Sequence, residues 1–460
     1  MLFRSRFAHF YQRDDHVAIF HSLTSQLVFG NQALLDTFLT IPSVGHEKYR
    51  KKTSVMSADE MRIFQQKGFL VENSSKDEEL LQKMRLKGKT RHGQRLHLMY
   101  LIPTTNCNLD CSYCFVERNR HSPEMSEAKA RKAVQYFFHH SRNAKERKII
   151  FYGGEPLLNP KAVLAAADEM IDLAHKDKSR GKITLNLITN GQLVTPELAD
   201  QLAARKISVS VSMDGPRHIH DACRKTTAGK ASHSKAMQAI KILRKAGHDP
   251  SISCTVTDRS LKHWDEIVEF IITKLQVRGL GFNLIIPGPP ERPSMSYENG
   301  IRATESILDA FKSFRKEGIY EDRVMRRVKP FSKKSFHYKD CLGVGGQIAV
   351  TPDGDVGPCQ GLIGQKEYFP LNIERDFFLP IYKNPLFLKW TDRFPLNFDE
   401  CLGCPALSIC GGGCPIASLR EKGSIWEIDE RICSQAKPIH EWLVWDLFIN
   451  TNRKRNSATH

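Results

Sequence analysis

Three cysteines that directly follow an apolar run are the feature that most constrains how this chain can fold. Cys107, Cys111 and Cys114 are separated by three and then two residues, and the preceding run 98–102 has the composition of a buried strand. Thiolates are soft, charged ligands that suit iron–sulfur clusters or zinc. A structural zinc site needs a fourth ligand nearby, and no Cys or His close to this loop completes such a set. Three ligands to a four-iron cluster leave one iron free, so the loop is predicted to hold a metal centre with an open position, with zinc as the alternative.

The overall composition indicates a soluble protein of several domains. At 460 residues the chain exceeds a single core, so two or three domains are expected. Hydrophobic residues make up 41% and charged residues 26%, which is ordinary for a globular protein. No window approaches 18 uninterrupted apolar residues, and the first residues lack the apolar core of a secretory signal. A cytoplasmic location is therefore expected.

The cysteine count agrees with a metal-binding protein. The chain has 12 cysteines, and disulfides are not expected in the cytosol because thiols stay reduced there. Ten of them fall in two groups, at 107–114 and 341–433, and such clustering indicates metal or iron–sulfur ligation. Cys223 and Cys254 stand alone and are interpreted as small buried residues.

The formal net charge of +17 raises the question of nucleic-acid binding. The basic residues are dispersed in short runs, at 50–52, 333–334 and 453–455, and short runs are typical of solvated faces. The charge pattern therefore disfavours nucleic acid. It suits equally well a partner with an acidic surface, such as an acidic peptide segment.

An alternation of strand-like and helix-like segments extends from residue 96 to about 287. Six segments have the length and composition of strands: 96–102, 148–152, 183–189, 207–213, 251–256 and 281–286. Helical segments lie between them, and one begins at Thr195 with a capping residue followed by proline. Strands that alternate with helices predict a parallel sheet, whose ligands bind at the carboxyl ends of the strands. The cysteine loop follows the first strand and is expected at that end.

The first 95 residues are predicted to form a separate small α/β unit. β-rich segments come first, Ser57 with Glu60 forms a capping box that begins a helix, and 74–95 suits a helix followed by an exposed linker. This order resembles the small winged-helix peptide-recognition element of peptide-modifying enzymes, which captures a leader peptide as an extra strand. The resemblance is one of topology and carries no motif. An N-terminal packing subdomain is the alternative.

Two motifs together give residues 96–290 a family resemblance. The C-x3-C-x2-C loop, with aromatic Tyr113 before its last cysteine, resembles the signature of radical S-adenosylmethionine (radical SAM) enzymes. The turn 153–156, Gly-Gly-Glu-Pro, ends the second predicted strand, where that family carries a glycine-rich turn that receives the amino group of SAM. Glycines let the backbone approach closely, and a carboxylate or carbonyls accept hydrogen bonds from the ammonium. The resemblance implies a partial (β/α)6 barrel and a SAM-binding 4Fe-4S cluster on the three cysteines.

The same resemblance implies further contacts to SAM. Polar groups after the third and fourth strands would approach its ribose and methionine parts, and Arg224 would meet its carboxylate through charge-assisted hydrogen bonds. An ordinary turn or a surface ion pair is the alternative for each of these residues. The implied SAM contacts are Tyr113, Gly153, Gly154, Glu155, Pro156, Asn190, Ser212, Asp214 and Arg224.

The C-terminal cysteines follow a longer pattern. Its spacing is Cys341-x12-Gly354-x4-Cys359, then Cys401-x2-Cys404-x5-Cys410-x3-Cys414 and, after eighteen residues, Cys433. This resembles, position for position, the seven-cysteine SPASM domain, which holds two auxiliary 4Fe-4S clusters. A zinc ribbon needs only four such ligands and leaves three cysteines idle. By resemblance, the outer cluster would be bound by Cys401, Cys404, Cys410 and Cys433, and the inner cluster by Cys341, Cys359 and Cys414.

The inner cluster lacks one cysteine of the family pattern. Many members carry another cysteine close to the first of the seven, and none lies just before Cys341 or between it and Cys359 here. Either one iron is open, or a non-cysteine ligand completes the set, with His337 and Asp340 as candidates. An open iron can bind a substrate thiolate directly, which matters for thioether chemistry.

The resemblance implies cleavage of SAM to a 5′-deoxyadenosyl radical that removes hydrogen from an unactivated carbon. The leading hypothesis is a maturase of ribosomally made (RiPP) peptides that forms a thioether or carbon–carbon crosslink. Its partners would be a precursor peptide or protein and an external electron donor such as flavodoxin or ferredoxin.

Two other functions remain open. One is an anaerobic sulfatase-maturing enzyme, which forms formylglycine on a sulfatase Cys or Ser. Those enzymes usually carry an acidic base directly after the cysteine of the Gly-x4-Cys element, where this chain has the neutral amide Gln360. The remote alternative is a non-enzymatic metal-binding protein that binds nucleic acid through its basic surface, and it predicts no SAM cleavage.

The predicted fold class is α/β, a partial radical SAM barrel with a winged-helix-like unit before it and a loop-rich SPASM iron–sulfur domain after it. A terminal helix is expected at 441–449, and the basic residues after it are expected to be disordered. The predicted order is a recognition unit and linker (1–95), the barrel (96–290), a connector (291–335), the SPASM domain (336–440) and the terminal helix with its tail (441–460).

Overall fold

The computed structural model describes residues 2–44, 56–92, 95–116, 124–177, 181–288 and 295–457. Parts of the predicted features lie outside these ranges: the basic run at 50–52, the end of the linker at 93–94, residues 291–294 of the connector and the tail residues 458–460.

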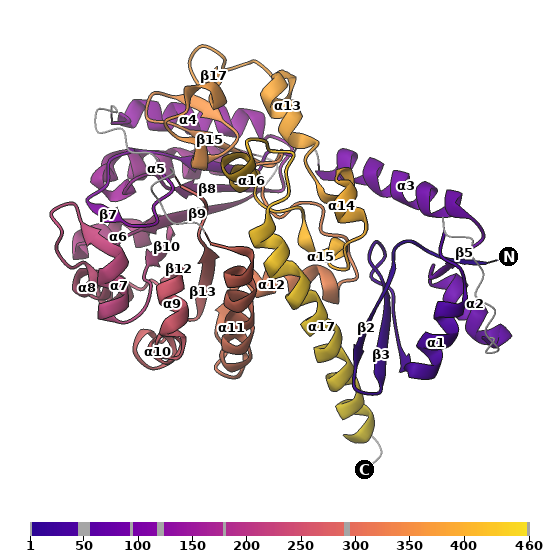
Figure 1. Ribbon diagram of the computed structural model, residues 1–460. Helices are drawn as coiled ribbons and strands as arrows, with labels where there is room; N and C mark the ends of the chain where they lie inside the picture. The colour runs from indigo at the N-terminus through magenta and orange to yellow at the C-terminus, as the bar shows by residue number, and fades with distance from the viewer. Residues whose placement is uncertain are drawn as a thin grey trace.

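A ten-stranded sheet forms the centre of the molecule, and its strand order is β14-β13-β12-β10-β9-β8-β6-β15-β16-β17 (Figure 1). The six predicted strands are confirmed as neighbours in one parallel sheet. Their bounds are β6 (Leu98–Leu101), β8 (Glu146–Phe151), β9 (Lys182–Thr189), β10 (Ser208–Ser212), β12 (Ser251–Val256) and β13 (Gly279–Leu284). The sheet has two edge strands, β14 and β17, so the barrel is open.

Four strands beyond the predicted six extend this sheet. The two-residue β14 (Tyr320–Glu321) adds in parallel to β13 at one edge. At the other edge β15 (Gln347–Val350) adds in parallel to β6, and β16 (Asp355–Gly357) and β17 (Leu371–Asn372) follow antiparallel. The C-terminal cysteine region is therefore built directly onto the sheet that carries the first cysteine loop.

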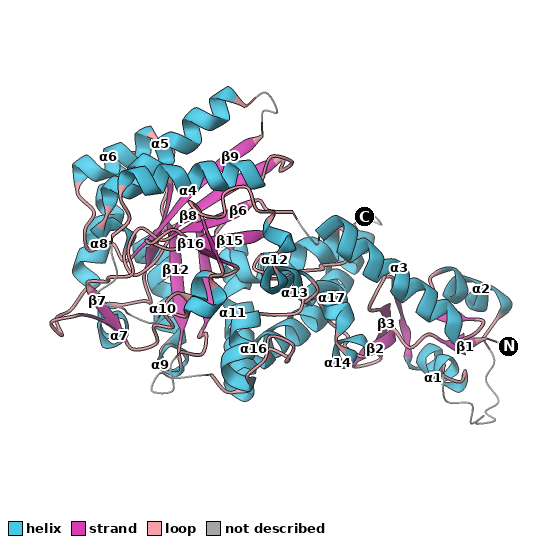
Figure 2. Ribbon diagram, turned by 90° about the horizontal axis from the view of Figure 1, so that it is seen from above, coloured by secondary structure: helices cyan, strands magenta, loops and turns pink. Residues whose placement is uncertain are grey.

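Helices cover the outer face of the sheet (Figure 2). Ser126 and Thr195 accept hydrogen bonds from backbone N–H groups of the first turns and so begin α4 and α6, as the capping signal at Thr195 predicts for α6. The covering helices are α4 (Glu127–His140), α5 (Pro160–Lys176), α6 (Pro196–Ala204), α8 (His233–Lys245), α10 (Trp264–Phe270) and α11 (Tyr297–Lys316).

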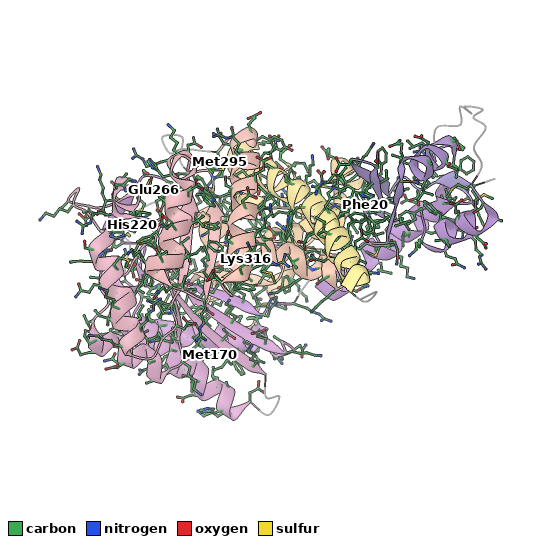
Figure 3. All side chains as sticks on the ribbon, turned by 90° about the horizontal axis from the view of Figure 1, so that it is seen from below. Phe20, Met170, His220, Glu266, Met295 and Lys316 are labelled. Carbon is green, nitrogen blue, oxygen red and sulfur yellow. The ribbon has the colours of Figure 1, made fainter. Side chains whose placement is uncertain are left out.

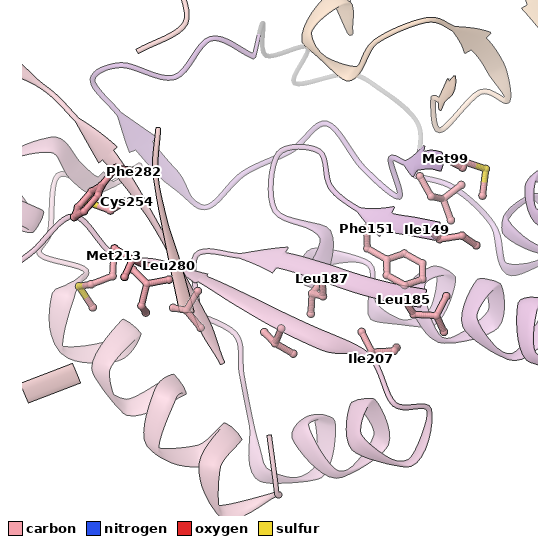
Figure 4. Close-up of a cluster of buried hydrophobic side chains, with 14 of the residues drawn as sticks. Met99, Ile149, Phe151, Leu185, Leu187, Ile207, Met213, Cys254, Leu280 and Phe282 are labelled. Atoms are coloured by element: carbon pink, nitrogen blue, oxygen red, sulfur yellow. The ribbon is translucent and has the colours of Figure 1, made fainter. Parts of the chain in front are cut away.

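The hydrophobic core lies between the strands and these helices (Figure 4). Alternate strand residues such as Ile149, Phe151, Leu185 and Leu187 point into it and are at most 3% exposed. Burying one such aromatic side chain stabilises the fold by about 3–5 kcal/mol relative to alanine. Because strand side chains alternate, the remaining positions face the interior of the barrel.

The N-terminal unit contains a three-stranded antiparallel sheet, β2 (Ala8–Arg13), β3 (His16–His21) and β4 (Leu27–Asn31). One face packs on α1 (Gln32–Thr40) and α2 (Ala58–Gln66), and α2 begins with the predicted capping box of Ser57 and Glu60. A short pair, β1 (Phe3–Arg4) with β5 (Leu70–Val71), completes the unit, and α3 (Ser74–His92) leads to the barrel.

The other face of this small sheet packs on the C-terminal helix α17 (Glu430–Ser457). The rings of Phe20 and His440 have centroids 4.8 Å apart, and Figure 3 shows Phe20 on the side of the unit that faces α17. Burial of His440 lowers the pKa of its imidazole to about 3, so the ring is neutral in this contact. The last helix therefore holds the N-terminal unit against the rest of the molecule.

Two segments are more helical than predicted. The connector contains α12 (Asp322–Ser332). Its sequence is highly charged and contains Pro330, which favours a non-helical connector. The terminal helix begins at Glu430 and not at 441, because packing against α11 keeps the chain helical through Pro438. It also continues to Ser457, so the disorder predicted for the tail from residue 452 onward is wrong as far as residue 457.

No helix within the described ranges combines the length and the apolar character that a bilayer crossing requires.

Candidate active site

The first cysteine loop follows β6 and is fastened by a second, smaller ribbon. Its strand β7 (Leu109–Cys111) pairs antiparallel with β11 (Arg224–Thr226), and Arg224 lies opposite Cys111. The N–H of Ser112 also donates to the carbonyl of Cys223 at 2.9 Å. Each of these strands has only three residues, which is too short for a periodic pattern in the sequence to predict it.

The three thiols line a cavity of about 300 Å³ at the carboxyl ends of the strands. Seven of the nine residues implied as SAM contacts line the same cavity: Tyr113, Gly153, Gly154, Glu155, Asn190, Ser212 and Arg224. The other two lie behind its wall: Pro156 begins a 3₁₀ turn, and Asp214 binds Arg224.

The glycine-rich turn is bound directly to the start of the cysteine loop. The N–H groups of Gly154 and Glu155 donate to the carbonyls of Thr104 (3.2 Å) and Asn106 (2.8 Å). A Cβ on Gly154 would lie 2.0 Å from the Asn106 oxygen, and Gly153 has a φ of +143°, which side chains rarely adopt. The glycines are thus required by the close approach of the two loops, whether or not a ligand is present.

The Glu155 carboxylate is occupied by the protein itself. One oxygen accepts hydrogen bonds from the Leu157 N–H (3.0 Å) and the Thr189 hydroxyl (2.7 Å), and the other accepts from the Asn190 N–H (2.7 Å). The side chain is 1% exposed, and burial raises its pKa to about 7 despite these donors. The carboxylate therefore ties the end of β8 to the end of β9, which leaves backbone carbonyls of the turn to receive a ligand ammonium.

Arg224 and Asp214 form a buried ion pair beside the thiols. The Nε and Nη2 atoms of Arg224 donate to the two carboxylate oxygens at 2.8 and 3.2 Å, and the Tyr113 hydroxyl donates to the same carboxylate. Burial opposes ionisation of Asp214, and the Arg224 guanidinium outweighs it, so the pKa of this carboxyl lies below its usual value. The remaining Nη1 atom lies 3.9 Å from the Sγ of Cys111. Arg224 thus places positive charge next to the cysteine loop.

Polar side chains from three strands complete this cavity. Ser212 of β10, Ser253 and Thr255 of β12 and Asn283 of β13 all line it. They occupy alternate strand positions, between apolar residues that point into the core. Only Ser212 was among the predicted residues, although the period-two alternation of small polar residues was the signal for the others.

A second cavity of about 310 Å³ adjoins the first. Cys341, Cys359 and Cys414 line it together, with Cys341 and Cys359 flanking the β15–β16 hairpin. The two cavities share a wall, since the same side chains line both: Tyr100, Phe115, Asn283, Leu284, Ile286, Arg323 and Gln360.

The three inner thiols lie near one another; Cys359 is buried, and Cys341 and Cys414 are partly buried. Burial and then the proximity of Cys414 raise the pKa of Cys341 to about 12. Burial also raises the pKa of Cys359, followed by the effects of Cys341 and Cys414. The Sγ atoms of Cys341 and Cys359 each accept a hydrogen bond at 3.3 Å, from the N–H groups of Gly343 and Gly361. Such donors stabilise sulfur in its anionic, ligating form.

The remaining four cysteines form a second group. They lie on or beside α14 (Asp399–Leu402), α15 (Leu407–Cys410) and α17, and are Cys401, Cys404, Cys410 and Cys433. Burial raises the pKa of Cys401, and the other three thiols raise it further, in the order Cys410, Cys433 and Cys404. The structure therefore brings the seven C-terminal cysteines together as a group of three and a group of four.

The spacing of the thiol groups disfavours a zinc site. Among the described side chains, no three cysteine Sγ atoms all lie within 4.8 Å of one another. A tetrahedral zinc with bonds of about 2.3 Å would hold its sulfurs only about 3.8 Å apart. Burial and mutual repulsion oppose ionisation of the thiols, and a multivalent cationic core would reverse both effects.

The two candidate non-cysteine ligands differ in position. Asp340 lines the cavity of the three inner thiols, whereas His337 is absent from the described lining. Asp340 already forms an ion pair of 2.9 Å with Arg327, and His337 Nε2 lies 3.8 Å from the same carboxylate. Burial opposes ionisation of Asp340, but Arg327, His337 and Arg326 together outweigh it, so the pKa of this carboxyl is lowered. A role of Asp340 as a ligand would require it to leave this pair.

Comparison with known proteins agrees with this geometry. Residues 101–271 match the radical SAM superfamily. The chain is 24% identical over 408 residues to the radical SAM cyclopropyl synthase TigE of Paramaledivibacter caminithermalis, covering 82% of this chain and 81% of that protein. It is 27% identical over 341 residues to a cysteine-type anaerobic sulfatase-maturating enzyme of Clostridium perfringens, covering 69% of this chain and 88% of that protein.

Solved structures share the fold. A structure of anSMEcpe with bound AdoMet superposes with a TM-score of 0.64 at 22% identity and covers 78% of this chain and 99% of that one. SuiB of Streptococcus suis, bound to its precursor peptide SuiA, superposes with a TM-score of 0.55 at 16% identity. It covers 94% of this chain and 100% of that one.

Proposed function

We propose that this chain, whose residues 101–271 match the radical SAM superfamily, is a maturase that crosslinks a ribosomally made peptide. The observation that carries this proposal is the shared wall of the two cavities. A substrate residue that lies against Tyr100, Asn283 and Gln360 would contact both the first cysteine loop and the inner cysteine group. Such a position suits a reaction that begins at one centre and delivers an electron to the other.

Membership in this superfamily implies SAM and one 4Fe-4S cluster. Cys107, Cys111 and Cys114 would hold the cluster, and together with SAM it supplies a 5′-deoxyadenosyl radical that removes hydrogen from carbon. The chain's own residues set the conditions for that chemistry. Carbonyls of the Gly153–Gly154 turn would receive the SAM ammonium, and Arg224, held by Asp214, would offset the negative charge of the thiolates.

The seven C-terminal cysteines are proposed to hold two auxiliary clusters. Cys401, Cys404, Cys410 and Cys433 would bind the outer one, and Cys341, Cys359 and Cys414 the inner one. The burial of these thiols, their proximity and their spacing support this assignment. With three cysteines, the inner cluster would keep one position for a substrate thiolate or, after separation from Arg327, for Asp340.

The sulfatase-maturing alternative is less well supported, because the shared wall carries no obvious base. The residue after Cys359 is Gln360, which lines both cavities and cannot take up a proton near neutral pH. Among the described lining residues, the only carboxylates are Glu155 in the first cavity and Asp340 in the second. Both are already engaged by the protein.

The N-terminal unit is proposed to bind part of the peptide. Its sheet has β2 and β4 as edge strands, while α1, α2 and α17 cover its faces. An extended peptide can add to such an edge through backbone hydrogen bonds. Photo-crosslinking from a bound precursor should label Ala8–Arg13 or Leu27–Asn31, and labels confined to the barrel would contradict the proposal.

The maturase assignment is tested by anaerobic co-expression with a short peptide encoded beside the gene. A crosslink removes hydrogen, so the peptide should lose a mass equal to a pair of hydrogen atoms, and fragmentation should fail between the joined residues. A sulfatase peptide offered in parallel should stay unchanged. An unmodified precursor, recovered from an enzyme that cleaves SAM, would contradict crosslinking of that partner.

A further inference from the structure

Three cations, Arg323, Arg326 and Lys148, line the second cavity, and Arg323 also belongs to the wall that this cavity shares with the first. Helix α12 follows the edge strand β14 and packs against β13 and α17, which directs its first turns toward the barrel interior. Arg323 lines both cavities, and Arg326, one turn later, lines the second. Lys148 of β8 also lines the second cavity.

These cations are enclosed by protein and still in contact with solvent. The side chains of Arg323 and Arg326 keep 31% and 41% of their surface accessible. Burial nevertheless lowers the pKa of Arg323, and the neighbouring Arg326 guanidinium lowers it further. Burial and Arg326 likewise lower the pKa of Lys148. Burial opposes the charge of Arg326, but the Asp322 and Asp340 carboxylates together outweigh it and raise its pKa, so this guanidinium stays charged in a space that an incoming ligand can enter.

One carboxylate serves both arginines. Asp322 lies 2.7 Å from Arg326 Nε and 3.7 Å from Arg323 Nη1. Arg323 also donates to the side-chain oxygen of Asn283, which is neutral and lines the shared wall. The buried Glu321 carboxyl accepts hydrogen bonds from the backbone N–H groups of Phe282, Arg323 and Val324, and burial raises its pKa.

The other two cations that line the second cavity have carboxylates of their own. Arg327 pairs with Asp340 at 2.9 Å, and Arg431 pairs with Asp429 at 2.9 Å. Both of these arginines are almost completely buried, unlike Arg323 and Arg326. Within the second cavity, the cations without a buried carboxylate partner are therefore Arg323, Arg326 and Lys148, and Arg323 lies on the shared wall where the substrate would lie.

We infer that Arg323 and Arg326 bind a carboxylate of the substrate, so that the peptide carries an acidic side chain or a free C-terminus next to its reacting residue. This inference rests on the proposed function and names the class of substrate for that same site. A guanidinium presents a planar fork of N–H donors that matches a carboxylate. The substrate carboxylate would replace water in the cavity. It would also balance the positive charge of Arg323 and Arg326 that Asp322 alone does not neutralise. It would also anchor the substrate between the first cysteine loop and the inner cysteine group.

The test measures binding of defined peptides to the full-length protein with its clusters reconstituted. The probes are acetyl-Gly-Gly-Glu-Gly-Gly-amide, the same peptide with Gln in place of Glu, and acetyl-pentaglycine with a free carboxylate. Equilibrium dialysis should show that a carboxylate peptide binds at least about tenfold more tightly than the Gln peptide. Preference for the Glu peptide identifies a side-chain anchor, and preference for the free terminus identifies a C-terminal anchor.

Substitution assigns the effect to residues. Arg323→Gln and Arg326→Gln should each reduce the discrimination to about twofold or less. Arg278→Gln makes the same change at a side chain that is 89% exposed, and it should leave the discrimination unchanged. Equal binding of all three peptides to the unmodified protein overturns the inference, and so does full discrimination in Arg323→Gln.

A second measurement separates substrate binding from compensation of cluster charge. If the arginines served only to offset a cluster, Arg323→Gln would shift the reduction potential of the inner cluster and leave peptide discrimination intact, which overturns the inference. SAM cleavage by the unmodified protein is followed in parallel. Cleavage without peptide discrimination overturns only the carboxylate site, and discrimination without cleavage overturns only the maturase proposal.

Discussion

The first cysteine loop and the outer group of four cysteines hold their sulfur ligands in place in different ways. Around the first loop, backbone hydrogen bonds do most of this: β6 joins the parallel sheet, β7 pairs with β11, and the glycine-rich turn donates to Thr104 and Asn106. Around the outer group, α14 and α15 have four residues each. The first loop is thus part of a large sheet, whereas the outer group lies in a region with little regular structure.

Buried arginines support the outer region in place of a hydrogen-bonded sheet. Arg393 is 1% exposed and donates to the carbonyls of Ile425, Gly412 (2.7 Å) and Glu427 (3.1 Å). Arg327 donates in the same way to the carbonyls of Ile409 and Cys410. Each guanidinium satisfies carbonyls that would otherwise be buried without a partner.

This difference indicates which of the two cysteine sites depends on its metal for folding. The first loop has its backbone partners in place without a metal, so its cluster adds mainly function. Three of the outer cysteines lie on or beside α14 and α15, which have only four residues each, so metal binding there is expected to contribute folding energy as well.

Removing the three thiols of the first loop is expected to abolish activity while leaving the fold intact, which is the largest of the predicted effects. Replacing Cys107, Cys111 and Cys114 by Ala should abolish SAM cleavage, measured as 5′-deoxyadenosine, while circular dichroism and the thermal midpoint change little. Cys254→Ala, at a buried cysteine outside the three groups, is the matched control and should retain cleavage. Global unfolding of the triple variant would show that the first loop also depends on its metal.

Arg393→Met tests the support of the outer region. The change keeps an unbranched side chain but removes all its donors, so at least three buried carbonyls lose their partner. We expect a loss of about 3–5 kcal/mol in the free energy of unfolding of the C-terminal region. Limited proteolysis should show early cleavage within 393–433. Protection equal to that of the unmodified protein would mean that the cysteine groups alone hold the region.

The pH dependence of the free energy of unfolding tests the buried Glu155 side chain, which joins the end of β8 to the end of β9. Its pKa is about 7 in the fold against an ordinary value of 4.5 for a glutamate side chain, so the folded state binds more protons between these values. The stabilisation is fully present below pH 4.5 and is lost as pH rises toward 7, by about 3 kcal/mol at most. Denaturant unfolding of Glu155→Gln should lack this decline. A decline equal to that of the unmodified protein would assign it to another group.

Gly154→Ala tests the close approach of the two loops. Its Cβ would meet the Asn106 carbonyl at 2.0 Å, so one of the loops must move, at a cost of about 1–3 kcal/mol. Gly403→Ala is the control, since nothing lies within 4 Å of a Cβ there. Thermal unfolding measures both. Equal stability of the two variants would contradict the backbone support of the first loop.

Some parts of the fold were readable from local sequence. The six parallel strands were predicted because each is a short run with buried alternate positions. The helix that begins at Thr195 was predicted from its capping residue. Helix α12 was missed because it is highly charged and contains Pro330, and the start of α17 was missed because Pro438 normally ends a helix.

The candidate site likewise has one part that local sequence predicts and another part that it does not. The ligand types and their order could be read from the sequence, because cysteine spacing and a Gly-Gly-Glu-Pro turn are local patterns. Only the tertiary structure decided that Glu155 binds the next strand, that Arg224 lies against Cys111, and that Arg323 and Gln360 stand between two cavities. These contacts join residues far apart in the chain, and their partners are set by sheet order and by the packing of α12, which no local pattern encodes.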